Sequence, residues 1–170
     1  MRVWNVAVLA GVAGLWVASG TQRERPVLGE ATSALAPLEG RVAMQPADAH
    51  ATRDLAQAYL DAASPGLALA MVERAPLAVR REPAIEHTYA RALLDQGRAI
   101  DALAAERRVL DACAGDPATP CDAWLLASAT RRADILAELV QLGIEDAQAH
   151  PEASAVAYHN ATREARLALQ

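Results

Sequence analysis

The stretch that decides the fold is residues 89–110, YARALLDQGRAIDALAAERRVL. It joins two apolar-striped segments through Gly97, and glycine is the residue that most readily ends a helix in a left-handed conformation. Its pattern also occurs 34 residues earlier, where Ala56, Tyr59, Leu60, Asp61 and Ala68 precede Ala90, Leu93, Leu94, Asp95 and Ala102. A period of this length predicts a helix-turn-helix unit that must stack on a neighbour to bury its apolar face.

The composition favours an all-α fold. The chain has 170 residues, of which 53% are hydrophobic and 22% charged, so it can bury the core of a folded domain. Alanine is abundant and Phe is absent. Because alanine favours helices but buries little area, we expect a thin core and closely spaced helices.

Apolar side chains recur at three- and four-residue steps in several segments, which is the helical period. Turn residues separate these segments, and Ser64 before Pro65 and Asp48 before residue 49 have the side chains that cap helix starts. The spacing predicts helices over residues 34–44, 49–62, 65–75, 83–95, 98–112, 122–142 and 151–169. The short loops between them favour antiparallel neighbours.

Residues 3–18 form an apolar stretch that only Asn5 interrupts, and Arg2 precedes it. This arrangement is typical of a signal peptide, and as a helix the stretch has about the length needed to enter a bilayer. We therefore expect residues 1–20 to be a cleaved signal peptide or a retained membrane anchor, followed by a linker over residues 21–33. The alternative interpretation is a buried core helix.

Cys113 and Cys121 bracket a loop of turn residues, AGDPATP, between two predicted helices. Helical hairpins bring such positions together, so we expect a disulfide between them. Disulfides persist in oxidising compartments. The pair therefore favours an extracytoplasmic location, either periplasmic or anchored in the inner membrane and facing the periplasm.

The repeated residues resemble tetratricopeptide repeats over about residues 34–113. The family pattern has a small residue, a large one three positions later and a small one twelve positions after the first, as in Ala56, Tyr59 and Ala68. The resemblance implies a right-handed stack of antiparallel helix pairs over residues 34–170, with a divergent pair at 122–169. Two features depart from the family: its early Trp is missing from both units, and Trp124 stands where a third small residue belongs.

The resemblance also implies a site for a protein or peptide segment. In the family, the first helix of each unit lines a concave face. By position, that face carries His50, Arg53, Gln57 and Asp61 in the first unit and His87, Arg91 and Asp95 in the second. Arginines there can bind a carboxylate with both ends of the guanidinium. The same residues also fit a solvated helix face with pairs four residues apart.

We find no motif for catalysis, and the sequence predicts no metal site and no cofactor. HExxH, GxSxG and the Gly-rich phosphate loop are missing, and the absence of lysine excludes Schiff-base chemistry. The histidines are scattered and are expected at surface or cap positions: His50, His87, His150 and His159. The net charge of −5, without a basic stripe, argues against nucleic-acid binding.

Together these features predict a non-catalytic adaptor of the bacterial cell envelope that holds a partner segment on its concave face. The first alternative is a structural subunit of a stable oligomeric envelope complex. The second is an enzyme of unrecognised class that uses the histidines and acidic residues. The third is an anchored module that faces the cytoplasm.

Overall fold

A computed structural model describes residues 28–115 and 121–167 of the chain, and all regular structure in these ranges is α-helical. The chain divides into two compact units, residues 1–34 and 35–170. Helix α2, Leu28–Met44, begins in the first unit and continues into the second. The predicted all-α class is therefore confirmed for the described part of the chain.

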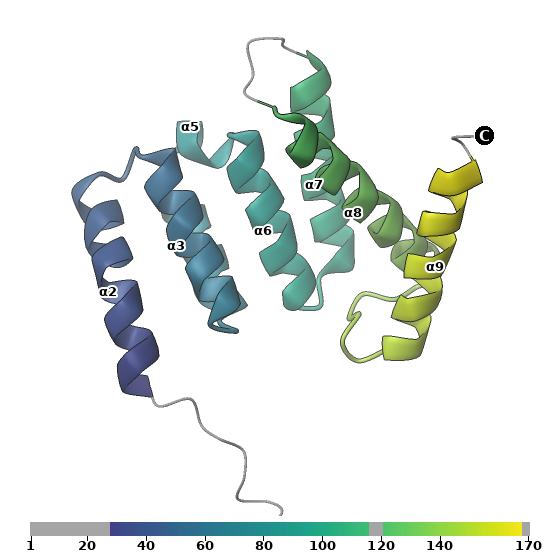
Figure 1. Ribbon diagram of the computed structural model, residues 1–170, viewed down its shortest axis with the longest axis horizontal. Helices are drawn as coiled ribbons and strands as arrows, with labels where there is room; N and C mark the ends of the chain where they lie inside the picture. Colours follow the sequence, from purple (N-terminus) through teal and green to yellow (C-terminus); the bar gives the residue numbers. More distant parts are fainter. Residues whose placement is uncertain (1–27, 116–120, 168–170) are drawn as a thin grey trace, which may run out of the picture. The chain divides into compact units, whose positions relative to one another are not determined.

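The second unit continues from α2 as a series of helices joined by short connections (Figure 1). The helices are α3 (Ala49–Asp61), α4 (Pro65–Arg74), α5 (Leu77–Arg80), α6 (Pro83–Asp95), α7 (Ala99–Gly115), α8 (Ala123–Gln141) and α9 (Pro151–Leu167). The predicted boundaries of α3, α4, α6 and α8 agree with these to within one residue at each end.

Antiparallel packing organises the helices of this unit. Helix α3 packs against α4, α6 against α7, and α8 against α9. The first helices of these pairs also meet, since α6 contacts both α3 and α8. Figure 1 shows α3, α6 and α8 running in the same direction, with α7 and α9 returning in the opposite direction. Helices 49–61 and 83–95 therefore lie alongside each other in matching orientation.

The helix starts follow from local side-chain chemistry. Asp48 caps α3 by accepting a hydrogen bond from the backbone N–H of Ala51 at 3.0 Å. Asp122 does the same for α8 through the N–H of Leu125 at 2.7 Å. Ser64 stands at the predicted N-cap position of α4, with Pro65 in the first turn, but its hydroxyl donates to the carbonyl of Ala62 at 3.2 Å and makes no cap bond.

The helix ends share one backbone motif. After α6, Gly97 has φ of +72°, and the N–H of Arg98 bonds the carbonyl of Leu93 at 3.0 Å. This is the left-handed termination that the sequence predicts for Gly97. The same arrangement ends α3 at Ala63, with φ of +51°, and α8 at Gly143, with φ of +71°.

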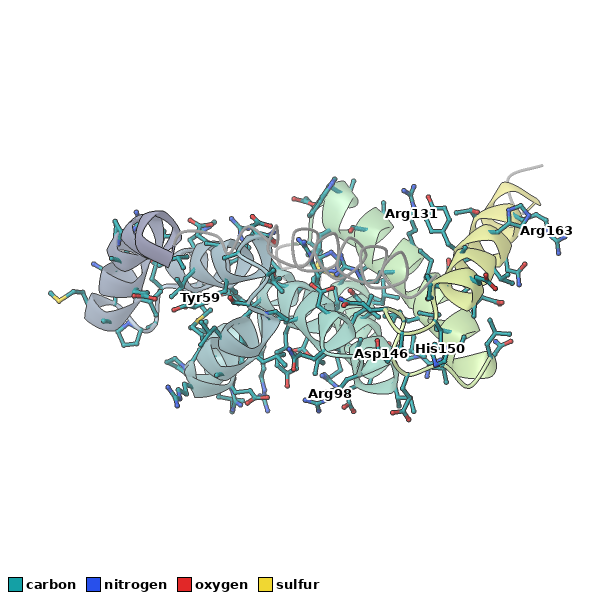
Figure 2. The ribbon with its side chains drawn as sticks, turned by 90° about the horizontal axis from the view of Figure 1, so that it is seen from below. Tyr59, Arg98, Arg131, Asp146, His150 and Arg163 are labelled. Atoms are coloured by element: carbon teal, nitrogen blue, oxygen red, sulfur yellow. A yellow bond between two sulfur atoms is a disulfide. The ribbon has the colours of Figure 1, made fainter. Side chains whose placement is uncertain are left out.

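The core is thin and rich in alanine. Ala56 and Ala90 are fully buried, and so is Ala102. Larger side chains such as Leu93 and Leu136 fill the space between helices. Tyr59 connects α3 to α2, because its hydroxyl donates to Glu39 Oε1 at 2.6 Å. Figure 2 shows Tyr59 near one end of the helix row, far from Arg163 in α9.

Two parts of the structure differ from the sequence-based expectations. Helix α2 begins at Leu28, so residues 28–33 of the expected linker are helical and Pro37 lies inside a helix. The four-residue helix α5 was not predicted, because its short segment lies between Pro76 and Pro83 and shows no helical period.

The predicted signal or anchor segment, residues 1–20, lies outside the described residues. Among the helices that are described, none combines the length and the apolar character needed to cross a membrane.

Candidate functional site

A groove of about 640 Å³ runs across the first helices of the three helix pairs. We call it the α3–α6–α8 groove. Helix α3 contributes one wall, α6 the floor and α8 the other wall. Its lining residues are His50, Arg53, Asp54, Gln57, Glu82, Pro83, Ala84, His87, Thr88, Arg91, Asp122, Trp124, Leu125, Ser128 and Arg132.

Most of the residues assigned to the concave face lie along this groove. They are His50, Arg53, Gln57, His87 and Arg91. The other two, Asp61 and Asp95, do not line it, because they follow one turn further along their helices. Both instead lie near the guanidinium of Arg91, at 3.9 Å and 4.0 Å respectively.

The α3 wall is polar and solvated. Arg53 approaches His50 Nδ1 at 3.3 Å and Asp54 Oδ1 at 3.7 Å. Gln57 donates to Asp61 Oδ1 at 2.7 Å along the same helix. These contacts between neighbouring turns are weak in water. A ligand can therefore replace these contacts and bind the α3 side chains instead.

His87, in contrast, is not a surface residue, and the prediction that placed it there is wrong. It is 6% exposed, because α7 and α8 pack over this part of α6. Its Nδ1 lies 2.9 Å from Glu106 Oε2, and its Nε2 lies 3.0 Å from Ser128 Oγ. The histidine therefore connects a buried carboxylate in α7 to a half-buried hydroxyl in α8.

Glu106 is completely buried, and both of its carboxylate oxygens have partners. Arg132 Nη1 donates to Glu106 Oε1 at 2.9 Å and to the carbonyl oxygen of His87 at 3.0 Å. A buried carboxylate without partners is costly, and here the arginine and the imidazole satisfy both oxygens. Because a carboxylate only accepts, we assign the hydrogen on Nδ1 of His87, and Nε2 then accepts from Ser128.

Trp124 forms the most exposed apolar part of the groove. Its side chain is 71% exposed, although it stands on the same helix as the buried Leu125. The indole ring meets the His87 imidazole edge to face, with 6.2 Å between ring centroids and an interplanar angle of 88°. An aromatic ring in this position offers a contact surface to a ligand beside the buried polar group.

The disulfide that the sequence predicts is present and supports the α8 wall. Cys113 at the end of α7 and Cys121 before α8 have Cα atoms 5.7 Å apart. Both cysteines pack against a small apolar cluster of Val109, Leu125 and Ala129. The bridge therefore fixes the start of α8, where two groove residues, Trp124 and Leu125, are located.

The sequence did not predict the three residues that form the polar network around His87 at the edge of the groove: Glu106, Ser128 and Arg132. One signal was available for the first of them. Glu106 lies 34 residues after Val72, so it takes a position that is apolar in the first unit. A charged residue in such a position needs partners. No comparable signal identifies Ser128 or Arg132, because polar residues are common along solvated helix faces.

The described residues hold no group of three or more His, Cys, Asp and Glu side chains arranged to bind a metal ion. The residues that line the groove offer hydrogen bonding, charge and one exposed aromatic ring. Its arginines suit carboxylates, and its Ser128–His87–Glu106 row suits proton transfer.

The repeated alanines are buried in both units, as their matching positions in the sequence suggest. They are Ala56 and Ala68 in the first unit and Ala90 and Ala102 in the second. Membership of the tetratricopeptide family stays a prediction from these residues. No family model matches the chain, and no curated protein or solved structure matches it either.

Proposed function

We propose that this protein is an extracytoplasmic adaptor that holds a segment of a partner protein in the α3–α6–α8 groove. In this proposal the helix pairs form a right-handed stack of the tetratricopeptide type, and binding requires no chemical step. The observation that carries the proposal is the groove itself, which crosses three helices and presents Trp124 on its α8 wall beside polar side chains.

Arg91 supports a partner with acidic groups. Its carboxylate neighbours Asp61 and Asp95 lie at 3.9 Å and 4.0 Å, beyond ordinary hydrogen-bond distance. A carboxylate on a partner can therefore form closer bonds to this guanidinium than the protein itself supplies. Trp124 adds the kind of aromatic anchor that carries much of the binding energy in protein interfaces.

The location rests on two features. The Cys113–Cys121 disulfide is typical of an oxidising compartment. Residues 3–18 have the composition of a signal peptide or anchor. Thiol labelling of intact cells tests this part: a cysteine pair that reacts without prior reduction would contradict an extracytoplasmic location and favour a module facing the cytoplasm.

Site-specific photocrosslinking in cells tests the groove. A photoreactive amino acid replaces Gln57 or Trp124 in the groove, and Leu67 or Ile100 on exposed surfaces of α4 and α7 serves as the matched control. We expect a discrete protein adduct from the groove positions and none from the controls. Adducts of equal yield from all four positions, or from the controls alone, would contradict the proposal.

Substitution then measures the strength of the contact. Trp124→Ala is expected to weaken binding of the captured partner by at least about tenfold, as for a central aromatic anchor. Tyr158→Ala, which removes an exposed aromatic side chain from α9, is the control and should leave the affinity unchanged. A permanent oligomer of this chain is the competing function, and a molecular mass that stays oligomeric on dilution would favour it.

A further inference from the structure

Three side chains from three helices form a continuous hydrogen-bonded row at the edge of the groove. Ser128 Oγ in α8 lies 3.0 Å from His87 Nε2 in α6. On the other side of the imidazole, Nδ1 lies 2.9 Å from Glu106 Oε2 in α7. A nucleophile, a base and a carboxylate that orients the base have this order and these separations in serine hydrolases.

The buried end of the row is held firmly. Glu106 is fully buried, and Arg132 occupies its second oxygen at 2.9 Å. Arg132 also donates to the backbone carbonyl of His87, which fixes the helix that carries the imidazole. Because Glu106 faces Nδ1, it orients His87 with Nε2 toward the serine.

The other end of the row is open. Ser128 is half-buried and lines the groove. Trp124 also lines the groove and lies one turn earlier on the same face of α8. A ligand in the groove can therefore reach the hydroxyl oxygen and rest against the indole ring. A polar network that served only to join three helices would not need its terminal hydroxyl in a groove.

We propose that Ser128 is the nucleophile of an acyl-transfer site, with His87 as general base and Glu106 as its positioning residue. The substrate class is carboxylic esters whose acyl or aryl group packs on Trp124. This activity goes beyond the adaptor function and does not depend on it, because partner binding needs neither the Ser128 hydroxyl nor the charge on Glu106.

The reaction balances with water as the only co-reactant. Ser128 Oγ bonds to the ester carbonyl carbon while its proton passes to His87 Nε2. The tetrahedral intermediate collapses, the bond from carbon to the alcohol oxygen breaks, and that oxygen takes the proton from Nε2. Water then loses a proton to Nε2 as it attacks the acyl group, and Ser128 Oγ leaves with that proton. The products are a carboxylic acid and an alcohol.

The negative charge of the intermediate requires a positive group, since the backbone N–H of Ser128 lies within α8 and is used by the helix. Arg91 stands one turn from His87 on the same face of α6 and lines the groove. Arg132 also lines the groove, but it is bonded to Glu106 and to the His87 carbonyl, so we assign the stabilisation of the oxyanion to Arg91. Arg91→Gln should slow acylation while Ser128 stays intact.

Covalent labelling of the full chain tests the proposal. The probes are a fluorophosphonate, with the adduct mapped by peptide mass spectrometry, and p-nitrophenyl acetate, with release of p-nitrophenol followed for an acylation burst. We expect one phosphonate per chain on Ser128 and none in Ser128→Ala. Ser64→Ala removes a hydroxyl outside the groove and should keep full labelling.

A folded protein that takes up no phosphonate, or takes it up on other residues with Ser128 unmodified, would overturn the proposal. Equal burst amplitudes in the wild type and in Ser128→Ala would do the same. Glu106→Gln keeps the size of the side chain and removes its charge, and it is expected to slow labelling by about 100-fold. If Glu106 has only a structural role, a Glu106→Gln variant that folds natively by circular dichroism should be labelled at the wild-type rate.

Discussion

Glu106 takes the place in the α6–α7 pair that Val72 takes in the α3–α4 pair. The two residues are 34 positions apart, and their exposed fractions are 0% and 3%. One helix pair therefore uses an apolar contact where the next uses a buried carboxylate. This single exchange brings Arg132 and His87 into a common network and sets the polar end of the α3–α6–α8 groove.

Replacing Glu106 by the valine of the first unit should destabilise the protein. Glu106→Val leaves the guanidinium of Arg132 and the imidazole of His87 without their buried carboxylate, and we expect the free energy of unfolding to fall by about 3–5 kcal/mol. Urea denaturation followed by circular dichroism measures the change. Glu106→Val combined with Arg132→Leu removes both charges and should recover part of the loss, whereas equal stability of the single variant and the wild type would disprove the network.

Exchanging the residues at two helix ends should change stability in opposite directions. Gly97→Ala puts a Cβ into a left-handed backbone and within 3.1 Å of Asp146, so we expect a loss of about 1–2 kcal/mol. Ala63→Gly relieves the left-handed strain at the equivalent end of α3. The larger entropy of glycine in the unfolded chain offsets part of this relief, so the free energy of unfolding should rise by about 0.5–1 kcal/mol. Thermal unfolding of both variants measures this, and shifts of the same sign would contradict the assigned backbone.

Reduction of the disulfide should weaken the fold and loosen the α8 wall. The Cys113–Cys121 bridge closes a short loop, with a sequence separation of 8, and its loss is expected to cost about 2–3 kcal/mol. Denaturant unfolding with and without a reductant measures the effect. A variant with both cysteines changed to serine is the control, because a reductant should not alter its stability. Reduction that leaves the wild type unchanged would show that the bridge does not contribute.

Stability should fall at high pH because of Tyr59. Burial, followed by its hydrogen bond to Glu39, raises the pKa of the Tyr59 hydroxyl to about 12 from the ordinary value of 10.0. The unfolded chain then releases this proton at lower pH than the folded chain, so the stabilisation is present below pH 10 and is lost as the pH rises toward about 12.

The absence of lysine makes this pH range easy to interpret, since tyrosines are the main groups that titrate there. Burial and a hydrogen bond to Glu73 also raise the pKa of Tyr89, so part of the pH dependence should remain in Tyr59→Phe. Urea midpoints between pH 9 and about 12 measure the slope. A slope that Tyr59→Phe leaves unchanged would contradict the buried hydrogen bond to Glu39.

Much of the fold follows from local sequence. Helix 83–95 and its end at Gly97 were predictable, because a helical period, a first-turn proline and a left-handed glycine all act over a few residues. The cysteine pair was predictable for the same reason, since its loop is short. The start of α2 at Leu28 was not, because the Pro and Gly residues near it favour a linker when considered alone.

The candidate site divides in the same way. The sequence by itself determined helices α3, α4, α6 and α8 and the polar residues on the first helix of the first two pairs. Only the tertiary structure decided that His87 is buried and that Ser128, Glu106 and Arg132 meet it, across separations of up to 45 residues. The physical reason is that caps and periodicity are local. The meeting of α6, α7 and α8 depends instead on how closely their alanine-lined faces approach, and that is settled by packing.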